Sequence, residues 1–137
     1  MKYYIDACIW RDYFENRSDK FRPLGDWALA LIKKIIKDED GYILYSDLIE
    51  DELLDYLTEK QVNEIFSVVP KGILIKVKVS LEQFRKAKYI PKKSKIPLKD
   101  AIHAILAASN NAILVTRDKH FYELQDFVII RKPEDLI

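Results

Sequence analysis

The sequence contains a single cysteine, Cys8, so an internal disulfide is excluded and no cysteine-based metal site can form. Long apolar runs are also lacking, because stretches such as Trp27–Ile32 and Ala104–Ala108 are far too short to cross a bilayer. Asp6 and Arg11 interrupt the apolar start of the chain, which excludes the core of a signal peptide. We therefore expect a cytoplasmic protein without a membrane partner.

What remains is the composition of an ordinary globular protein. Of the 137 residues 49% are apolar and 33% are charged, which is enough apolar material to bury a full core. No repeat, linker or low-complexity segment divides the chain, so we expect residues 1–137 to form a single domain. The net charge of +1 does not by itself indicate a nucleic-acid partner.

Charge is unevenly distributed along the chain. Residues 38–59 contain nine acids and no lysine or arginine, whereas residues 85–99 contain seven bases and no acid. Two solvated surfaces would explain these tracts, and so would an acidic pocket beside a basic track. We call the second segment the basic tract; its cations are Arg85, Lys86, Lys88, Lys92, Lys93, Lys95 and Lys99.

Short apolar runs alternate with helical patterns. The runs predict strands at 3–6, 42–45, 73–79, 112–115 and 127–130. Amphipathic spacing and capping residues predict helices at 9–15, 27–36, 47–57, 62–69, 81–89 and 97–110, a loop rich in lysine and proline before Pro97, and a short helix after Asp118. This alternation indicates an α/β fold, a three-layer α/β/α sandwich with a mainly parallel sheet of about five strands. The strand at 73–79 alternates apolar residues with lysine and is expected near a sheet edge.

Acidic residues follow two of these strands. In parallel α/β folds the ligand site lies beyond the carboxyl ends of the strands. Asp6 closes the first strand, and Thr116 and Asp118 directly follow the fourth. We expect them to gather at one edge of the sheet if the two strands are neighbours.

A further acid is selected by its place on a helix. Glu52 falls inside the apolar arc of the helix at 47–57, whereas Asp51 and Asp55 point away from the centre of that arc and Glu50 lies at its margin. A carboxylate that faces the core requires a partner, a proton or a cation. A glutamate at the rim of the core that reaches water is an equally good interpretation.

Asp100 lies in the first turn of a helix that is apolar almost all round and therefore central. A favourable charge at a helix N-terminus would explain Asp100, and an N-cap would explain Asp118. Taken together, however, several carboxylates at one sheet edge would repel one another, and a divalent cation would remove that repulsion. Oxygen ligands without histidine or cysteine clusters favour Mg²⁺ or Mn²⁺ over zinc, and such ions suit phosphodiester hydrolysis.

Four segments, taken together, resemble the motifs of PIN-domain nucleases, in the family's order and over most of the chain. They are Tyr4–Trp10, Ser46 with Glu52–Leu54, Pro97–Ala104 and Val115–Phe121. The size is similar to that of VapC-type toxins, the ribonuclease halves of toxin–antitoxin pairs. The resemblance implies a PIN-like fold, Mg²⁺- or Mn²⁺-dependent endoribonuclease activity, a homodimer and inhibition by a small antitoxin. The catalytic and metal-binding residues that it implies are Asp6, Glu52, Asp100 and Asp118.

The sequence departs from the family's pattern at two positions. Cys8 stands where many members have Asn, Ser or Thr, and His120 stands where some members have another Asp. For His120 an ordinary surface residue is the preferred interpretation, with a substrate contact or an auxiliary ligand as the alternatives.

Four residues are candidates for binding the RNA substrate. Thr116 either hydrogen-bonds a metal-bound water or caps its turn. Lys92, Lys93 and Lys95 precede Asp100 and are expected to hold the RNA backbone, with a solvated loop as the alternative.

Two other functions stay open at this point. One is a catalytically silent PIN-like module that binds RNA or takes part in an assembly. The other is a phosphoacceptor regulatory domain, which also gathers acids and a threonine at a parallel sheet edge. That class requires an acidic pair after the first strand and a lysine after the last one, for which Lys132 is a crude candidate.

Overall fold

A parallel sheet forms the centre of the molecule. The computed structural model describes residues 1–93 and 95–137, and for residues 91–93 it describes the backbone alone. Five strands lie in the order β3-β2-β1-β4-β5, and each neighbouring pair is parallel. The predicted α/β fold with a five-stranded sheet is therefore confirmed. The strands are β1 (Lys2–Ile5), β2 (Tyr42–Tyr45), β3 (Leu74–Lys76), β4 (Ala112–Val115) and β5 (Ile130–Arg131).

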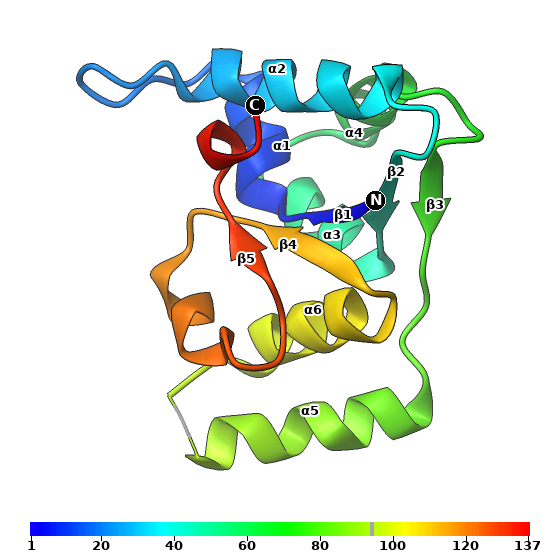
Figure 1. The fold of residues 1–137 in the computed structure, drawn as a ribbon, viewed down its shortest axis with the longest axis vertical. Coiled ribbons are helices and arrows are strands. Elements are labelled where there is room, and N and C mark those ends of the chain that lie inside the picture. Colours follow the sequence, from blue (N-terminus) through cyan, green and yellow to red (C-terminus); the bar gives the residue numbers. More distant parts are fainter. Residues whose placement is uncertain (94) are drawn as a thin grey trace.

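Helices cover both faces of this sheet. The α-helices are α1 (Ala7–Phe14), α2 (Leu24–Lys37), α3 (Asp47–Leu54), α4 (Glu59–Ser67), α5 (Leu81–Lys93) and α6 (Leu98–Ser109), and the 3₁₀ helices are η1 (Lys119–Leu124) and η2 (Pro133–Asp135). In Figure 1, α1, α2 and α4 lie on one side of the sheet and α6 lies on the other. α5 packs against the outer side of α6.

The central strands are buried on both faces. Tyr4, Ile5, Leu114 and Val115 have no exposed surface, which is why β1 and β4 are apolar runs rather than alternating ones. β3 lies at an edge of the sheet, as its alternating pattern predicted, and Ile75 is 38% exposed there. One hydrophobic core cluster includes residues from β1, β2, β4 and β5.

Several boundaries differ from the prediction because capping residues set them. α1 begins at Ala7 rather than near residue 9, since the Asp6 carboxylate accepts a hydrogen bond from the Ala7 amide. α4 begins at Glu59 because Thr58 and Gln61 form a capping box. Pro97 is the N-cap of α6 rather than part of its first turn.

The predicted loop before Pro97 and the predicted fifth strand are partly wrong. α5 continues to Lys93, so most of the basic tract is helical. The strand expected at 127–130 is shifted, because the amides of Phe127 and Val128 donate to the Leu124 carbonyl in a turn. Pairing with β4 starts only where the Leu114 amide donates to the Ile129 carbonyl.

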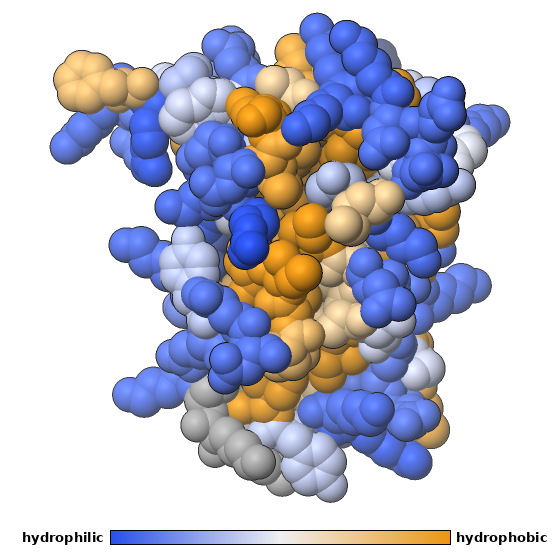
Figure 2. Space-filling view, viewed as in Figure 1, coloured by the Kyte–Doolittle hydropathy of each residue, from blue (hydrophilic) through white to orange (hydrophobic). Residues whose placement is uncertain are grey.

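Apolar side chains reach the surface beside the last strand. Figure 2 shows apolar surface over β4 and β5, bordered by hydrophilic edges. Met1, Phe127 and Ile129 are each between 44% and 57% exposed in this region and line one cavity of about 240 Å³. None of the described helices is long and apolar enough to cross a membrane.

Candidate active site

The first acid of the site is placed by the junction of β1 and α1. Asp6 follows the last residue of β1 and is only 7% exposed. Its Oδ1 accepts the Ala7 amide at 2.8 Å, and its Oδ2 accepts the Thr116 hydroxyl at 2.7 Å and the Cys8 thiol at 3.4 Å. Burial raises the pKa of Asp6, and the hydrogen bond from Thr116 opposes that rise. Donors to both of its oxygens thus fix the orientation of the carboxylate.

Cys8 is a partly buried thiol that donates a hydrogen bond to Asp6. Burial and the nearby Asp6 charge raise the pKa of Cys8 well above its usual value, so the side chain keeps its hydrogen and donates it to Asp6. In the family pattern this position often carries a polar residue. The thiol is therefore a weaker donor at the same place.

Thr116 connects the two strands that carry the site. β1 and β4 are neighbours, as expected, and Thr116 follows β4. Its hydroxyl donates to Asp6 and accepts the Asp118 amide at 3.0 Å. Because Thr116 is fully buried, it orders both acids from inside the protein. Its predicted contact with substrate stays a prediction.

Glu52 is held by a histidine that the sequence did not single out. The Oε1 atom of Glu52 lies 2.7 Å from Nε2 of His103, which is buried on α6. The Tyr4 hydroxyl lies 2.7 Å from Nδ1 of His103 and 2.7 Å from the hydroxyl of Ser46. Glu50 is placed differently, since it pairs with Lys76 at 2.9 Å. The helix-face argument therefore placed Glu52, rather than Glu50, at the site.

This chain of hydrogen bonds fixes the histidine tautomer. A carboxylate only accepts, so the Nε2 atom of His103 carries the hydrogen that points at Glu52. Nδ1 then accepts the hydrogen of the Tyr4 hydroxyl, whose oxygen accepts from Ser46. Ser46 in turn accepts the Ile49 amide as the N-cap of α3. The orientation of Glu52 is thereby tied to the start of its own helix.

The remaining two acids come from α6 and from the segment after β4. Asp100 lies in the first turn of α6, with 17% of its side chain exposed. Burial raises the pKa of Asp100 to about 6, and the charges of Asp118 and Asp6 add to the effect. Asp118 caps η1 by accepting the His120 amide, which agrees with the capping role considered from sequence. The His120 ring is 61% exposed and lies 3.3 Å from Asp118 and 3.6 Å from Asp100.

All four predicted acids line one cavity of about 270 Å³, which we call the carboxylate cavity. Its lining residues are Asp6, Ala7, Cys8, Arg11, Glu52, Asp55, Tyr56, Asp100 and Asp118. Three residues of this set were missed from sequence. Asp55 was expected to point away from the centre of the apolar arc, but it follows the last residue of α3 and reaches the cavity. Arg11 and Tyr56 reach the cavity only because α1 packs on α3.

The donor set fits a hard divalent cation. Two groups of possible ligand atoms each lie within 4.8 Å, one from Asp6, Glu52 and His103 and one from Asp100, Asp118 and His120. In the first group only the carboxylates are open to a cation, because both ring nitrogens of His103 are already hydrogen-bonded to Glu52 and Tyr4. Carboxylate oxygens predominate, and burial raises the pKa of Asp6 and of Asp100, which disfavours their charged forms. A bound Mg²⁺ or Mn²⁺ would favour the charged forms again.

The predicted RNA-binding lysines are only partly described. The side chains of Lys92 and Lys93 lie outside the described residues, so their role stays a prediction. Lys95 is exposed between α5 and α6, three residues before the start of α6.

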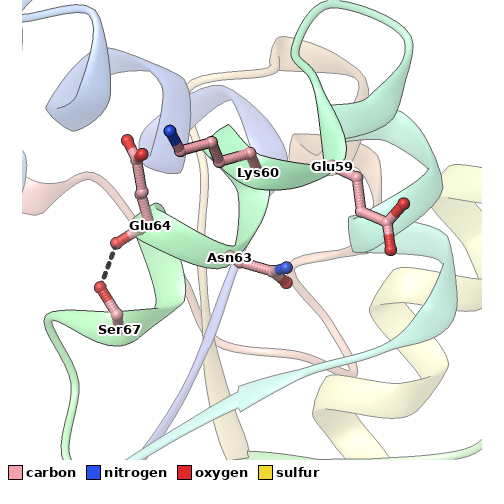
Figure 3. Close-up of a pocket in the computed structure, with 5 residues that line it drawn as sticks. All are labelled: Glu59, Lys60, Asn63, Glu64 and Ser67. Carbon is pink, nitrogen blue, oxygen red and sulfur yellow. Dashed lines mark hydrogen bonds between the residues drawn. The ribbon is translucent and has the colours of Figure 1, made fainter.

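A larger hollow lies elsewhere, on the surface of α4 (Figure 3). It has a volume of about 560 Å³ and is lined by Glu59, Lys60, Asn63, Glu64 and Ser67. These side chains point in different directions, and the Ser67 hydroxyl donates to the Glu64 carbonyl at 2.7 Å. Without converging polar groups it offers no chemistry comparable with that of the carboxylate cavity.

A parallel sheet with an acidic cavity beyond the carboxyl ends of β1 and β4 defines an α/β protein suited to divalent cations. The family model described as the PIN domain matches residues 3–126. The chain belongs to the PIN domain family. This confirms the resemblance drawn from the four motifs. No curated protein matches the chain in sequence.

Solved structures share the fold over almost the whole chain. VapBC2 from Rickettsia felis, bound to a DNA fragment from their promoter, has a TM-score of 0.70 at 16% identity, covering 96% of this chain and 98% of that one. VapBC-1 from nontypeable Haemophilus influenzae has a TM-score of 0.68 at 18% identity, covering 98% and 99%. A toxin–antitoxin complex from Klebsiella pneumoniae has a TM-score of 0.67 at 17% identity, covering 96% and 97%.

Proposed function

We propose that this PIN-domain protein is a metal-dependent endoribonuclease. The observation that carries the proposal is the convergence of Asp6, Glu52, Asp100 and Asp118, from four separate segments, on one cavity. Burial of like charges without full compensation costs stability, and proteins keep such arrangements at functional sites. Membership of the PIN domain family supports nuclease chemistry.

The residues of the site have different proposed roles. Asp6, Glu52, Asp100 and Asp118 would hold Mg²⁺ or Mn²⁺, which supplies an activated water and stabilises charge on the phosphate oxygens. His103 orients Glu52 and Thr116 orients Asp6, so both carboxylates are positioned before substrate arrives. Burial and the neighbouring acids raise the pKa of Asp100 to about 6, so this acid takes up a proton near neutral pH in the metal-free protein.

We further propose that the enzyme is the toxin of a toxin–antitoxin pair. The support is the similarity in fold and length to VapBC and other toxin–antitoxin structures. A small antitoxin protein is then the expected inhibitor, a homodimer the expected state in solution, and the cytoplasm the place where RNA is cleaved. Co-expression with the product of an adjacent antitoxin-like reading frame should give a stable complex without ribonuclease activity. A free, active nuclease in that preparation would contradict the toxin assignment.

Cleavage of single-stranded RNA tests the enzymatic proposal. The purified protein should cleave with Mg²⁺ or Mn²⁺ and stop when EDTA is added. Glu52→Gln should abolish cleavage and leave the fold intact, whereas Glu50→Gln, two positions away and paired with Lys76, should keep most activity. Cleavage that survives exhaustive chelation, or the reverse pattern of the two variants, would overturn the carboxylate mechanism.

A further inference from the structure

An arginine and a tyrosine form a stacked pair at the carboxylate cavity. The guanidinium carbon of Arg11 lies 3.7 Å from the centre of the Tyr56 ring, and both side chains line the cavity. Arg11 comes from α1, whereas Tyr56 follows the end of α3. Among the described residues, Arg11 is the one cation in the cavity lining.

Arg11 is largely buried, whereas Tyr56 is open to solvent. Arg11 is only 19% exposed and forms an ion pair with Glu15 at 3.3 Å, and its guanidinium covers one face of the Tyr56 ring. Tyr56 is nevertheless 66% exposed. The face of the ring that Arg11 does not cover is therefore available to a ligand. An exposed aromatic ring held in one orientation loses little conformational entropy when a flat ligand stacks on it.

The neighbouring groups indicate what kind of ligand fits. Carboxylates with a bound cation attract a phosphate, whereas an open aromatic ring attracts the flat face of a base. A nucleotide in a single strand offers both, and its base is free to leave its neighbours. In a duplex the bases are already paired and stacked, so the ring could not reach a base face.

We propose that Tyr56, supported by Arg11, is a stacking platform for one base of single-stranded RNA whose adjoining phosphate enters the carboxylate cavity. The inference rests on the proposed ribonuclease function and names how that site holds its substrate. Every base has a flat aromatic face, so the platform tolerates different sequences. Arg11 acts as a positioning residue for Tyr56.

Binding without cleavage tests the platform. In the Glu52→Gln background with Mg²⁺, the affinity for a short single-stranded RNA is measured by fluorescence anisotropy, with a second oligonucleotide that carries abasic sites. Tyr56→Ala should weaken binding to the intact RNA by about tenfold and should remove the preference over the abasic strand. Tyr56→Phe should bind the intact RNA almost as tightly as the parent protein, because the aromatic ring is kept. Arg11→Ala should give a smaller loss, because the ring stays but loses its support.

Tyr42→Ala is the matched control, since Tyr42 is 36% exposed at the start of β2, at the opposite end of the strand from the site. It should bind like the parent protein. If Tyr56→Ala binds both strands as the parent does while wild-type protein still cleaves RNA, the platform is wrong and the proposed function stands. If wild-type protein neither binds nor cleaves RNA, both are overturned.

Discussion

The raised pKa of Asp100 indicates that ionisation of this carboxyl destabilises the metal-free fold. Its pKa is raised to about 6 from 3.8 by burial first and by Asp118 and Asp6 second. The folded, metal-free protein therefore holds a proton on Asp100 at a pH where the unfolded chain has released it. By linkage, the stability that this group contributes is complete below pH 4 and is lost as the pH rises through about 6.

Replacement of Asp100 by asparagine should remove that pH dependence. Metal-free Asp100→Asn should unfold at higher denaturant concentration than wild type at pH 7.5, by roughly 1–3 kcal/mol, and the difference should vanish near pH 4. Asp126→Asn, at an exposed acid after η1, is the control and should change little. Added Mg²⁺ should stabilise wild type more than Asp100→Asn. A stability difference independent of pH would contradict the destabilising effect assigned to ionisation of this carboxyl.

His103 does not line the carboxylate cavity but orients Glu52, which does. Loss of His103 should therefore weaken metal binding. His103→Leu keeps the volume but leaves Glu52 without its partner, and the affinity for Mn²⁺ should fall about 10- to 100-fold, the range seen when groups behind metal ligands are removed. Titration calorimetry measures the change. Glu64→Leu, at the hollow on α4, provides the comparison and should bind Mn²⁺ like wild type. Equal affinities for all three proteins would make His103 a core residue only.

Between elements, the segment that carries Thr116 and Asp118 is anchored by a buried ion-pair network. Asp12 on α1 is 1% exposed and pairs with Arg17 at 2.8 Å and with Arg117 at 3.3 Å. Arg117 also reaches Glu134 on η2 at 2.8 Å. α1, the segment after β4 and the C-terminal helix are thereby joined just behind the site.

Removal of Arg117 should destabilise the fold strongly, because it leaves the buried Asp12 with one partner fewer. We expect Arg117→Ala to lower the free energy of unfolding by about 3 kcal/mol. Arg22→Ala, at an exposed pair with Asp19, should cost less than about 1 kcal/mol. Urea denaturation of the two variants compares them directly, and equal losses would show that the network contributes no more than a surface pair.

The elements differ in how far local sequence determines them. β2 and β4 were predicted to the residue, since each is an apolar run with a polar turn before it and a polar residue, Ser46 or Thr116, after it. β5 was misplaced, because the amides of Phe127 and Val128 are used in a turn that closes on the Leu124 carbonyl, and the apolar run at 127–130 does not distinguish that turn from a strand. The capping box of α4 was readable at Thr58 and Gln61, but the apolar pattern that starts at Val62 obscured it.

The same distinction applies to the site. Asp6 and Asp118 follow from strand ends, and Glu52 follows from a helix face, so sequence indicated all three. A single histidine on an apolar helix is indistinguishable in sequence from a core residue, which is why His103 was missed. Arg11 joins the site only through the packing of α1 on α3, and sequence spacing carries no information about that contact.

At the scale of the whole molecule, the basic tract is expected to guide RNA to the acidic site. α5 and α6 form a pair, and the tract leads to the N-terminal turn of α6, where Asp100 lies. A chain of cations at this place would offset the repulsion between RNA phosphates and the carboxylates.

Replacement of Lys92, Lys93 and Lys95 together by alanine should weaken RNA binding and reduce its dependence on salt. The slope of log affinity against log salt should fall by about 0.7 for each lysine that contacts a phosphate of a single strand. Lys33→Ala with Lys37→Ala, at exposed positions on α2 across the sheet, should leave the slope unchanged. An identical slope in all three proteins would mean that RNA approaches from another side.

The position of β1 at the centre of the sheet determines when the carboxylate cavity can form during synthesis. Its partner β4 is encoded near the other end of the chain, and the hydrogen bond from Thr116 to Asp6 spans 110 residues. At a synthesis rate of about 5–20 residues per second, β4 leaves the ribosome roughly 5–20 s after β1. A nascent chain therefore carries Asp6 without the partners that complete the carboxylate cavity. The cavity forms only when nearly the whole chain has been synthesised.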